Sequence, residues 1–304
     1  MKDLSNLCWK SRFVFMKGII LAGGQATRLR PASLAVTKQL MPVYDKPLIY
    51  YPLTTLILSG IKEILIICNP ENLSNFKKLF RTADTWGIDL SYSVQTSPGG
   101  IAESLIIAET YLSGSPTTLI LGDNLFHGPG LGRQLSGSFD GVGAQITAYY
   151  VTNPKEFGVI EFDDFGLVRS LEEKPQFPKS NWVVPGLYFF DNSAVERAKN
   201  LKRSSRGELE ITDLNLDYMK DGLLKVQVLP RGTTWLDMGT PNSLLEASEY
   251  IRAIQERQGI LVGSPEEAAW VMGLIKDDEL MSIANSLGAT AYAKSLLKIL
   301  NIKY

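Results

Sequence analysis

The sequence predicts an α/β protein with a doubly wound, Rossmann-like mixed sheet, added antiparallel strands and a C-terminal helical region. Three observations predict this fold class. Short apolar runs alternate with helical segments between residues 17 and 121, which is the order of βαβ units. Between 144 and 190 apolar and polar residues alternate, as they do in antiparallel strands. From about 243 onward, apolar residues recur at helical spacing.

The first half of the chain predicts a parallel sheet. Runs that are apolar on both faces, such as Ile64 to Cys68, are typical of strands covered by helices on both sides. Ligands of such sheets bind beyond the carboxyl ends of the strands. We therefore expect the chemistry at Gly23, Gln95 and Asp123. The expected strands are 17–22, 63–68, 90–95 and 117–121, and the expected helices are 50–59, 72–82 and 101–112.

The second half predicts antiparallel strands at 144–151, 158–162 and 183–190, followed by helices to residue 302. A second methionine, Met16, directly precedes the first strand, so residues 1–15 form an N-terminal extension outside the fold. The expected division is therefore 1–15, a core at 16–242, and a helical region at 243–304. A linker at 263–265 interrupts the final helices.

Composition excludes several classes of function. The 304 residues carry 31 Lys plus Arg against 32 Asp plus Glu, so no basic field favours nucleic acid. Two cysteines and one histidine argue against a disulfide framework, a histidine metal site or a serine triad. No run approaches the roughly 20 apolar residues that span a bilayer. We expect a cytoplasmic protein without nucleic-acid or membrane partners, in which Cys68 is a buried hydrophobe.

Several charged residues lie in patterns that favour phosphate chemistry. The Gly23–Gly24 turn lets backbone amides approach an anion, and Arg28 and Lys38 add positive charge. Asp123 and Asp237 each follow apolar residues and have a glycine nearby, a context suited to Mg²⁺ held together with phosphate oxygens. Acid and base stand side by side in Glu172–Glu173–Lys174, and Arg206 supplies a further basic group.

The motifs together resemble those of the glucose-1-phosphate thymidylyltransferases, within the nucleoside-diphosphate-sugar pyrophosphorylases, over about residues 16 to 300. This resemblance implies condensation of dTTP with α-D-glucose 1-phosphate to dTDP-glucose and pyrophosphate, with Mg²⁺ as cofactor, as the first step toward dTDP-rhamnose or other deoxysugars. It also implies a homotetramer with an interface site for an inhibitory dTDP-sugar. The ordered motifs are L-A-G-G-x-x-T-R-L-x-P, K-Q-L-M-P-V, Y-D-K-P, G-D-N, E-E-K-P, R-G-E-L-E-I-T-D and W-L-D-x-G-T.

The resemblance implies a nucleotide side at about 16–140 and a sugar side at about 141–242. It assigns Arg28, Lys38, Lys174, Asp123 and Asp237 to catalysis, the two aspartates as metal ligands. The nucleotide would be bound by Leu21, Gly23, Gly24, Gln95 and Gly100, and the sugar by Asn124, Gly158, Glu173, Val184, Gly186 and Arg206. Gln95 can offer a donor and an acceptor to thymine or uracil, which predicts use of dTTP, weaker use of UTP and discrimination against CTP.

Four positions depart from the family pattern. Ala26 replaces a glycine, and a left-handed backbone there would cost alanine about 1 kcal/mol. Gly99 replaces an Asp, which predicts a looser loop around Gly100 and poorer base discrimination. Phe157 replaces a Tyr and Pro185 replaces a Thr, and each change removes a polar group.

Two alternatives stay open. One is a pyrophosphorylase for another nucleotide or sugar 1-phosphate, and the other is a catalytically weak homologue that binds sugar nucleotides as a sensor or assembly subunit. His127 is interpreted as a turn residue which, with Arg231–Gly232, falls where interface contacts are expected. Trp235 is interpreted as a packing residue that positions Asp237.

Overall fold

The computed structural model describes residues 15–136 and 138–301. Its main feature is a ten-stranded mixed sheet in the order β10-β9-β11-β8-β12-β6-β1-β4-β5, with β13 beside β8. The predicted α/β fold with added antiparallel strands is therefore confirmed. Apart from Phe15, the predicted extension at 1–15 lies outside the described residues.

The parallel half of the sheet has β1 at its centre, between β6 and β4, with β5 at the edge. Side chains of β1 alternate between two cores, because Ile20 joins one cluster and Ile19 the other. Cys68 is fully buried, and burial raises the pKa of its thiol to about 11. The strands are β1 (Lys17–Ala22), β4 (Glu63–Cys68), β5 (Asp89–Val94) and β6 (Thr117–Leu121).

Helices cover both faces of this half, as a doubly wound sheet requires. The helix predicted at 101–112 is divided, because Ala108 ends one helix and precedes the next. The helix predicted at 72–82 is shorter and follows a 3₁₀ turn at Pro70–Asn72. The helices are α1 (Tyr50–Leu58), α2 (Leu73–Leu79), α3 (Glu103–Ile107) and α4 (Glu109–Leu112).

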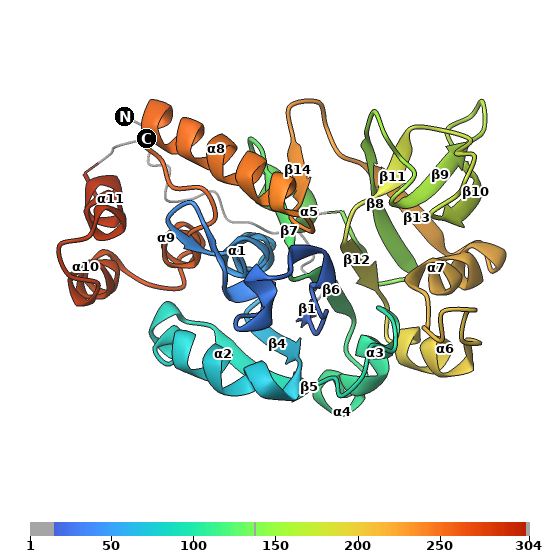
Figure 1. The fold of residues 1–304 in the computed structure, drawn as a ribbon, viewed down its shortest axis with the longest axis horizontal. Coiled ribbons are helices and arrows are strands. Elements are labelled where there is room, and N and C mark those ends of the chain that lie inside the picture. Colours follow the sequence, from blue (N-terminus) through green and yellow to red (C-terminus); the bar gives the residue numbers. More distant parts are fainter. Residues whose placement is uncertain (1–14, 137, 302–304) are drawn as a thin grey trace.

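The antiparallel half lies at the other end of the sheet (Figure 1). The strand predicted at 183–190 is two strands, because Pro185 and Gly186 interrupt it. Both strands pair with β8, but the first has β9 on its other side and the second has β6. Helices α6 (Ala194–Asn200) and α7 (Ile211–Lys220) pack on it through the second core cluster. The strands are β8 (Ala144–Tyr150), β9 (Gly158–Phe162), β10 (Val168–Glu173), β11 (Trp182–Val184), β12 (Leu187–Phe190) and β13 (Leu224–Val228). Of these, β13 pairs parallel to β8, whereas the other ladders of this half are antiparallel.

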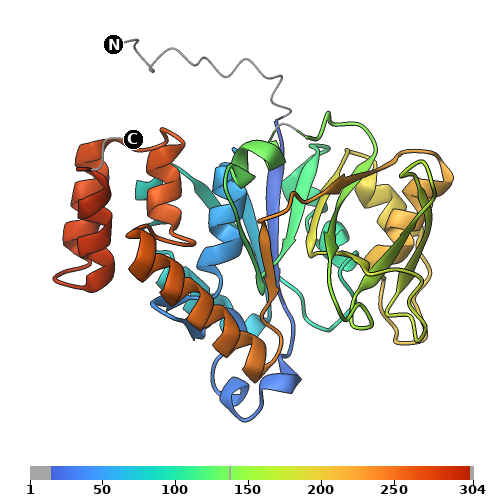
Figure 2. The same ribbon diagram turned by 90° about the horizontal axis from the view of Figure 1, so that it is seen from above.

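The C-terminal helices gather at the end of the molecule opposite β9 and β10, as Figures 1 and 2 show. The first of them begins at a capping box in which Thr240 and Ser243 bond reciprocally. No helix among the described residues is long and apolar enough to cross a membrane. The helices are α8 (Pro241–Gln258), α9 (Pro265–Val271), α10 (Asp277–Ser286) and α11 (Ala291–Ile299).

A buried lysine joins these helices to the N-terminal half. Lys46 lies in the hairpin of β2 (Pro42–Val43) and β3 (Lys46–Pro47). Its ammonium donates to Gln255 Oε1 at 3.1 Å and to the carbonyl of Val262 at 3.0 Å. Burial lowers the pKa of Lys46, against the opposing charge of Asp45. The Y-D-K-P motif therefore anchors the C-terminal region to the sheet domain.

Candidate active site

A two-stranded ladder brings the two predicted metal ligands together. Asp123 directly precedes β7 (Asn124–His127), and Asp237 ends β14 (Thr234–Asp237). The strands are antiparallel, with Asp237 opposite Asn124, and the amide of Met238 donates to the carbonyl of Asp123 at 3.0 Å. Neither strand was predicted from the sequence. Two carboxylates that are far apart along the chain therefore share one site.

Asp123 is held as a carboxylate by its neighbours. The ammonium of Lys38 bonds Asp123 Oδ2, and Asn124 Nδ2 donates to Asp123 Oδ1 at 2.9 Å. Burial alone would raise the pKa of Asp123, but the charge and hydrogen bond of Lys38 bring it below its ordinary value. Asp123 is thus ionised in the absence of any ligand.

The pKa of Asp237 is shifted in the opposite direction from that of Asp123. Burial and the charge of Asp123 raise its pKa to about 6, although Lys38, Arg28 and Lys174 act against this shift. Arg28 reaches the site across Gly239, where a Cβ would stand 2.7 Å from Arg28 Nη2 and 3.3 Å from Asp237 Oδ2. Asp237 therefore lacks enough positive charge nearby to stabilise its ionised form fully.

The loop that is predicted to bind the nucleotide contains a left-handed turn at Ala26. Ala26 has φ 48° and ψ 40°, so alanine adopts the conformation at which glycine was expected. Space around a Cβ at Gly24 is open, whereas a Cβ at Gly23 would lie 2.5 Å from Gln95 Oε1. Leu21, at the end of β1, accepts from the amide of Gly122 at 2.9 Å. The loop thus lies between Gln95 and the carboxylate pair.

The predicted base-reading residues lie at a crowded turn. Gln95 follows β5 and is buried. Gly100 has φ 98°, and a Cβ there would stand 2.3 Å from the carbonyl of Leu209. Gln95 Nε2 donates to Glu103 Oε2 at 2.9 Å. Sequence reasoning missed Glu103, whose only indication was its acidic side chain at the start of a helix.

Two of the predicted sugar-side residues, Gly158 and Val184, lie close to Glu173 at the end of β10. A Cβ at Gly158 would stand 3.4 Å from Glu173 Oε2 and 3.9 Å from Val184 Cβ. Thr212 lies in the R-G-E-L-E-I-T-D motif but was not among the predicted site residues, and its Oγ1 donates to Glu173 Oε2 at 2.6 Å. Gly186 is connected to Asn124, because its amide donates to Asn124 Oδ1 at 3.2 Å.

Two basic side chains flank this group. Lys174 has φ 45°, and its ammonium stands 3.9 Å from Glu173 Oε1. Arg206 Nη2 is also 3.9 Å from Glu173 Oε1, but it pairs more closely with Glu210 Oε2 at 2.7 Å. Arg206 is thus held by acids of its own motif, with part of its guanidinium exposed.

Trp235 is a packing residue, as predicted, but its indole bonds Asn124 and not Asp237, the residue that it was predicted to position. It is buried, and its ring makes edge contacts with Tyr149 and Phe157. Trp235 Nε1 donates to Asn124 Oδ1 at 2.5 Å. The indole therefore orients Asn124 directly, and Phe157 fills the space beside it without a polar group.

Comparison with known proteins shows the family to which the chain belongs. The profile of the family described as nucleotidyl transferase matches residues 17–254. A glucose-1-phosphate thymidylyltransferase of Mycolicibacterium smegmatis is 50% identical over 286 residues, which cover 94% of this chain and 99% of the relative. One from Neisseria meningitidis is 49% identical over 286 residues, with the same coverage.

The chain belongs to the nucleotidyl transferase family, among the glucose-1-phosphate thymidylyltransferases. A solved structure from Bacillus anthracis, provisionally assigned as a glucose-1-phosphate thymidylyltransferase and bound to sucrose, superposes with a TM-score of 0.72 at 35% identity. The superposition covers 78% of this chain and 95% of the Bacillus anthracis chain. A UDP-glucose pyrophosphorylase with bound UDP-glucose shares the fold, with a TM-score of 0.69 at 21% identity over 79% of this chain and 99% of its own.

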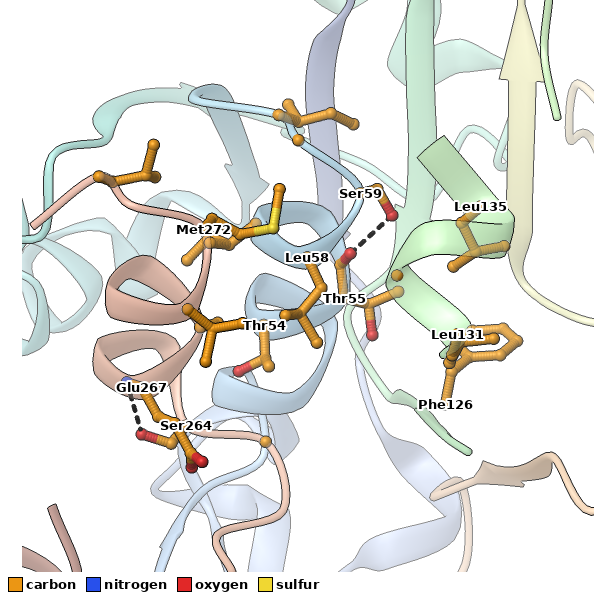
Figure 3. A pocket seen from close by; sticks show the side chains of 18 of the residues that line it. Thr54, Thr55, Leu58, Ser59, Phe126, Leu131, Leu135, Ser264, Glu267 and Met272 are labelled. Carbon is orange, nitrogen blue, oxygen red and sulfur yellow. Dashed lines mark hydrogen bonds between the residues drawn. The ribbon is translucent and has the colours of Figure 1, made fainter. Parts of the chain in front are cut away.

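This nucleotidyltransferase also has a cavity of about 850 Å³ away from the carboxylate pair. Figure 3 shows it between α1, α9 and α5 (Leu131–Ser136), with Leu58, Leu131 and Met272 among the labelled walls. None of the predicted site residues lines it. His127 does line it and bonds Tyr250 Oη through Nδ1 at 2.8 Å, while burial lowers the pKa of His127.

Proposed function

We propose that this chain condenses dTTP with α-D-glucose 1-phosphate to give dTDP-glucose and pyrophosphate. The observation that carries the proposal is the meeting of Asp123 and Asp237 through the β7–β14 ladder, with Lys38 bonded to Asp123 and Arg28 beside Asp237. Paired acids beside basic side chains suit the transfer of a highly charged phosphoryl group. The names of the thymidylyltransferase relatives support the choice of substrates.

The carboxylate pair fits a Mg²⁺ cofactor. Within residues 15–136 and 138–301, no three His, Cys, Asp or Glu side chains form a cage that could hold a metal alone. Mg²⁺ is commonly held by one or two carboxylates together with substrate phosphates. The raised pKa of Asp237 indicates unbalanced negative charge, which a bound cation would neutralise. Mg²⁺ on Asp123 and Asp237 would stabilise the charge that develops on the α-phosphate.

The nucleotide would lie along the carboxyl ends of β1 and β5. In this proposal Leu21, Gly23 and Gly24 face it through the backbone, since a Cβ at Gly24 meets nothing within 4 Å. Arg28 and Lys38 bind its phosphates. Gln95 and Gly100 face the base from the opposite wall.

The sugar phosphate would enter from the antiparallel half. Lys174 and Arg206 carry the charges that bind its phosphate, and Glu173 accepts hydrogen bonds from sugar hydroxyls. The remaining walls of the pocket come from Asn124, Gly158, Val184 and Gly186. This proposal keeps the division into a nucleotide side at 16–140, a sugar side at 141–242 and a helical region at 243–304.

The reaction needs position and charge more than proton transfer. A phosphate oxygen of glucose 1-phosphate uses its electron pair to form a bond to the α-phosphorus of dTTP. The bond from that phosphorus to the β-phosphate oxygen breaks, and pyrophosphate leaves with the electron pair. Because the attacking oxygen is already ionised, no general base is required. Lys174 would orient the attacking phosphate, while Arg28 and Lys38 would hold the triphosphate.

A panel of triphosphates tests this proposal. Purified protein is incubated with glucose 1-phosphate, Mg²⁺ and each of dTTP, UTP, CTP, ATP and GTP, and released pyrophosphate is measured. The proposal expects release with dTTP, less with UTP, and loss of release on chelation of Mg²⁺. Preference for another triphosphate would favour a different pyrophosphorylase. Binding of dTDP-glucose without turnover would favour a sugar-nucleotide sensor.

The proposal extends to assembly and location. A homotetramer with an interface site for an inhibitory dTDP-sugar is supported by the cavity that His127 lines. Helix α9 forms one of its walls (Figure 3), and its lining includes neither Asp123 nor Asp237. Light scattering gives the oligomeric state, and inhibition by dTDP-rhamnose that is noncompetitive with dTTP tests the site. A cytoplasmic location rests on the low cysteine count.

A further inference from the structure

The side-chain amide of Gln95 has a defined orientation. Its Nε2 donates to Glu103 Oε2 at 2.9 Å and to the carbonyl of Gly100 at 3.4 Å. Its Oε1 faces Gly23, because a Cβ built there would stand 2.5 Å away from that oxygen. The donor end of the amide is therefore occupied within the protein, and the acceptor end points to the nucleotide loop.

Glu103 also fills the space beside Gly99. A Cβ at Gly99 would overlap the carboxylate of Glu103, with all three carboxyl atoms within 2.0 Å. Gly99 is thus required by the position that Glu103 adopts. A carboxylate from α3 thus occupies the space beside Gly99, where the family pattern has an Asp. The looser loop expected around Gly100 stays a prediction.

Arg203 fixes the carboxylate of Glu103. Arg203 Nη2 bonds Glu103 Oε1 at 2.9 Å, and Nη1 donates to the carbonyls of Gly99 at 3.3 Å and Gly207 at 2.8 Å. The backbone of Leu209 adds two bonds to this turn, donating to Gly99 O at 2.8 Å and accepting from Ala102 N at 3.1 Å. Both oxygens of Glu103 therefore have partners, which limits its rotation.

We propose that Glu103 is the specificity-determining positioning residue of the base site. This inference rests on the proposed function and assigns Glu103 the task of keeping Gln95 Oε1 directed at the base. A primary amide can rotate and exchange donor for acceptor. An ionised carboxylate only accepts, so Glu103 permits a single orientation.

The fixed orientation changes what Gln95 can recognise. With Nε2 engaged, Gln95 presents an acceptor alone to the base, in place of the donor and acceptor expected from the sequence. Thymine and uracil carry an N–H at ring position 3 that can donate to Oε1, whereas cytosine carries a lone pair there. Rejection of cytosine follows from the repulsion of two acceptors.

A double-mutant cycle on equilibrium binding tests the inference. The dissociation constants of dTTP and CTP are measured by calorimetry with Mg²⁺ and without glucose 1-phosphate, for wild type, Glu103→Gln, Gln95→Ala and the double variant. Glu103→Gln lets the amide of Gln95 rotate, so the preference for dTTP over CTP should fall about tenfold or more. In the Gln95→Ala background the same change should have no further effect on that ratio.

Glu109→Gln is the matched control, because Glu109 is exposed on α4 and pairs with Lys199. It should leave the ratio unchanged. An undiminished preference in Glu103→Gln, or an equal loss in both backgrounds, would overturn the inference. Wild type that binds dTTP and CTP equally would overturn it even if pyrophosphate is released. A preference that depends on Glu103, without any turnover, would remove the proposed function and keep this inference.

Discussion

Asp237 lies directly opposite Asn124 in the antiparallel β7–β14 ladder, and its carboxyl group is near enough to Asp123, the residue before Asn124, for the charge of Asp123 to raise its pKa. Trp235, two residues before Asp237, holds the side chain of Asn124. One short ladder therefore sets the spacing of both acids and the orientation of the amide next to them.

Replacing either acid by its amide should abolish most turnover. Asp123→Asn and Asp237→Asn should each lower kcat by about 100-fold or more, because one carboxylate of an electrostatic clamp contributes several kcal/mol in the transition state. Pyrophosphate release is the measurement, and circular dichroism checks the fold. Asp278→Asn, on the exposed start of α10, is the control. Near-normal turnover in either site variant contradicts the assignment.

Lys174 should act on the sugar phosphate. Lys174→Ala removes a cation beside Glu173 and should raise KM for glucose 1-phosphate far more than KM for dTTP, with a lower kcat because the attacking oxygen is less well placed. Steady-state kinetics with each substrate varied gives the two constants. Lys179→Ala is the control, because Lys179 is exposed and pairs with Glu161. It should change neither KM. A selective rise in KM for dTTP would contradict the assignment, because it would show that Lys174 binds the nucleotide and not the sugar phosphate.

The left-handed turn at Ala26 should be relieved by glycine. Ala26→Gly should raise the free energy of unfolding by up to about 1 kcal/mol and lower KM for dTTP, since the loop no longer has a strained residue. Ser113→Gly is the matched control, because Ser113 has φ 49° at the end of α4. Ser113→Gly should raise the free energy of unfolding by a similar amount and leave KM for dTTP unchanged. Destabilisation by Ala26→Gly would show that the alanine is not strained.

Glu267 should make stability depend on pH. Burial and the charge of Glu266 raise the pKa of Glu267 to about 7, despite the opposing charge of Lys46. The folded state therefore binds this proton more tightly than the unfolded state, and the stabilisation is lost as pH rises through about 7. Glu267→Gln should stabilise the protein relative to wild type, by on the order of 1 kcal/mol more at pH 8 than at pH 5.5.

Thermal denaturation at the two pH values measures this difference. Glu246→Gln, on the exposed side of α8, is the control and should show no dependence of its effect on pH. An equal effect of Glu267→Gln at both pH values would show that Glu267 does not titrate between pH 5.5 and pH 8 in the folded state.

The strands of the parallel half could be predicted closely because their information is local. A run of apolar residues such as Ile64 to Cys68 is buried on both faces whatever its neighbours are. The strand and helix boundaries that were predicted wrongly depend on single residues within an otherwise regular pattern. Pro185 has no amide hydrogen to continue the strand, and Ala108 ends one helix where the periodic pattern predicted a continuous one.

For the candidate site, too, some features could be predicted from the sequence and others depend on the tertiary structure. Sequence alone determined which residues carry charge, where the glycine turn follows β1, and which family motifs the chain contains. Tertiary structure decided that Asp237 faces Asn124, that Glu103 holds Gln95 and that Lys46 is buried among the C-terminal helices. These relationships depend on strand register and on burial, and both are set when segments distant in sequence pack together, because only then do charges leave water and acquire partners.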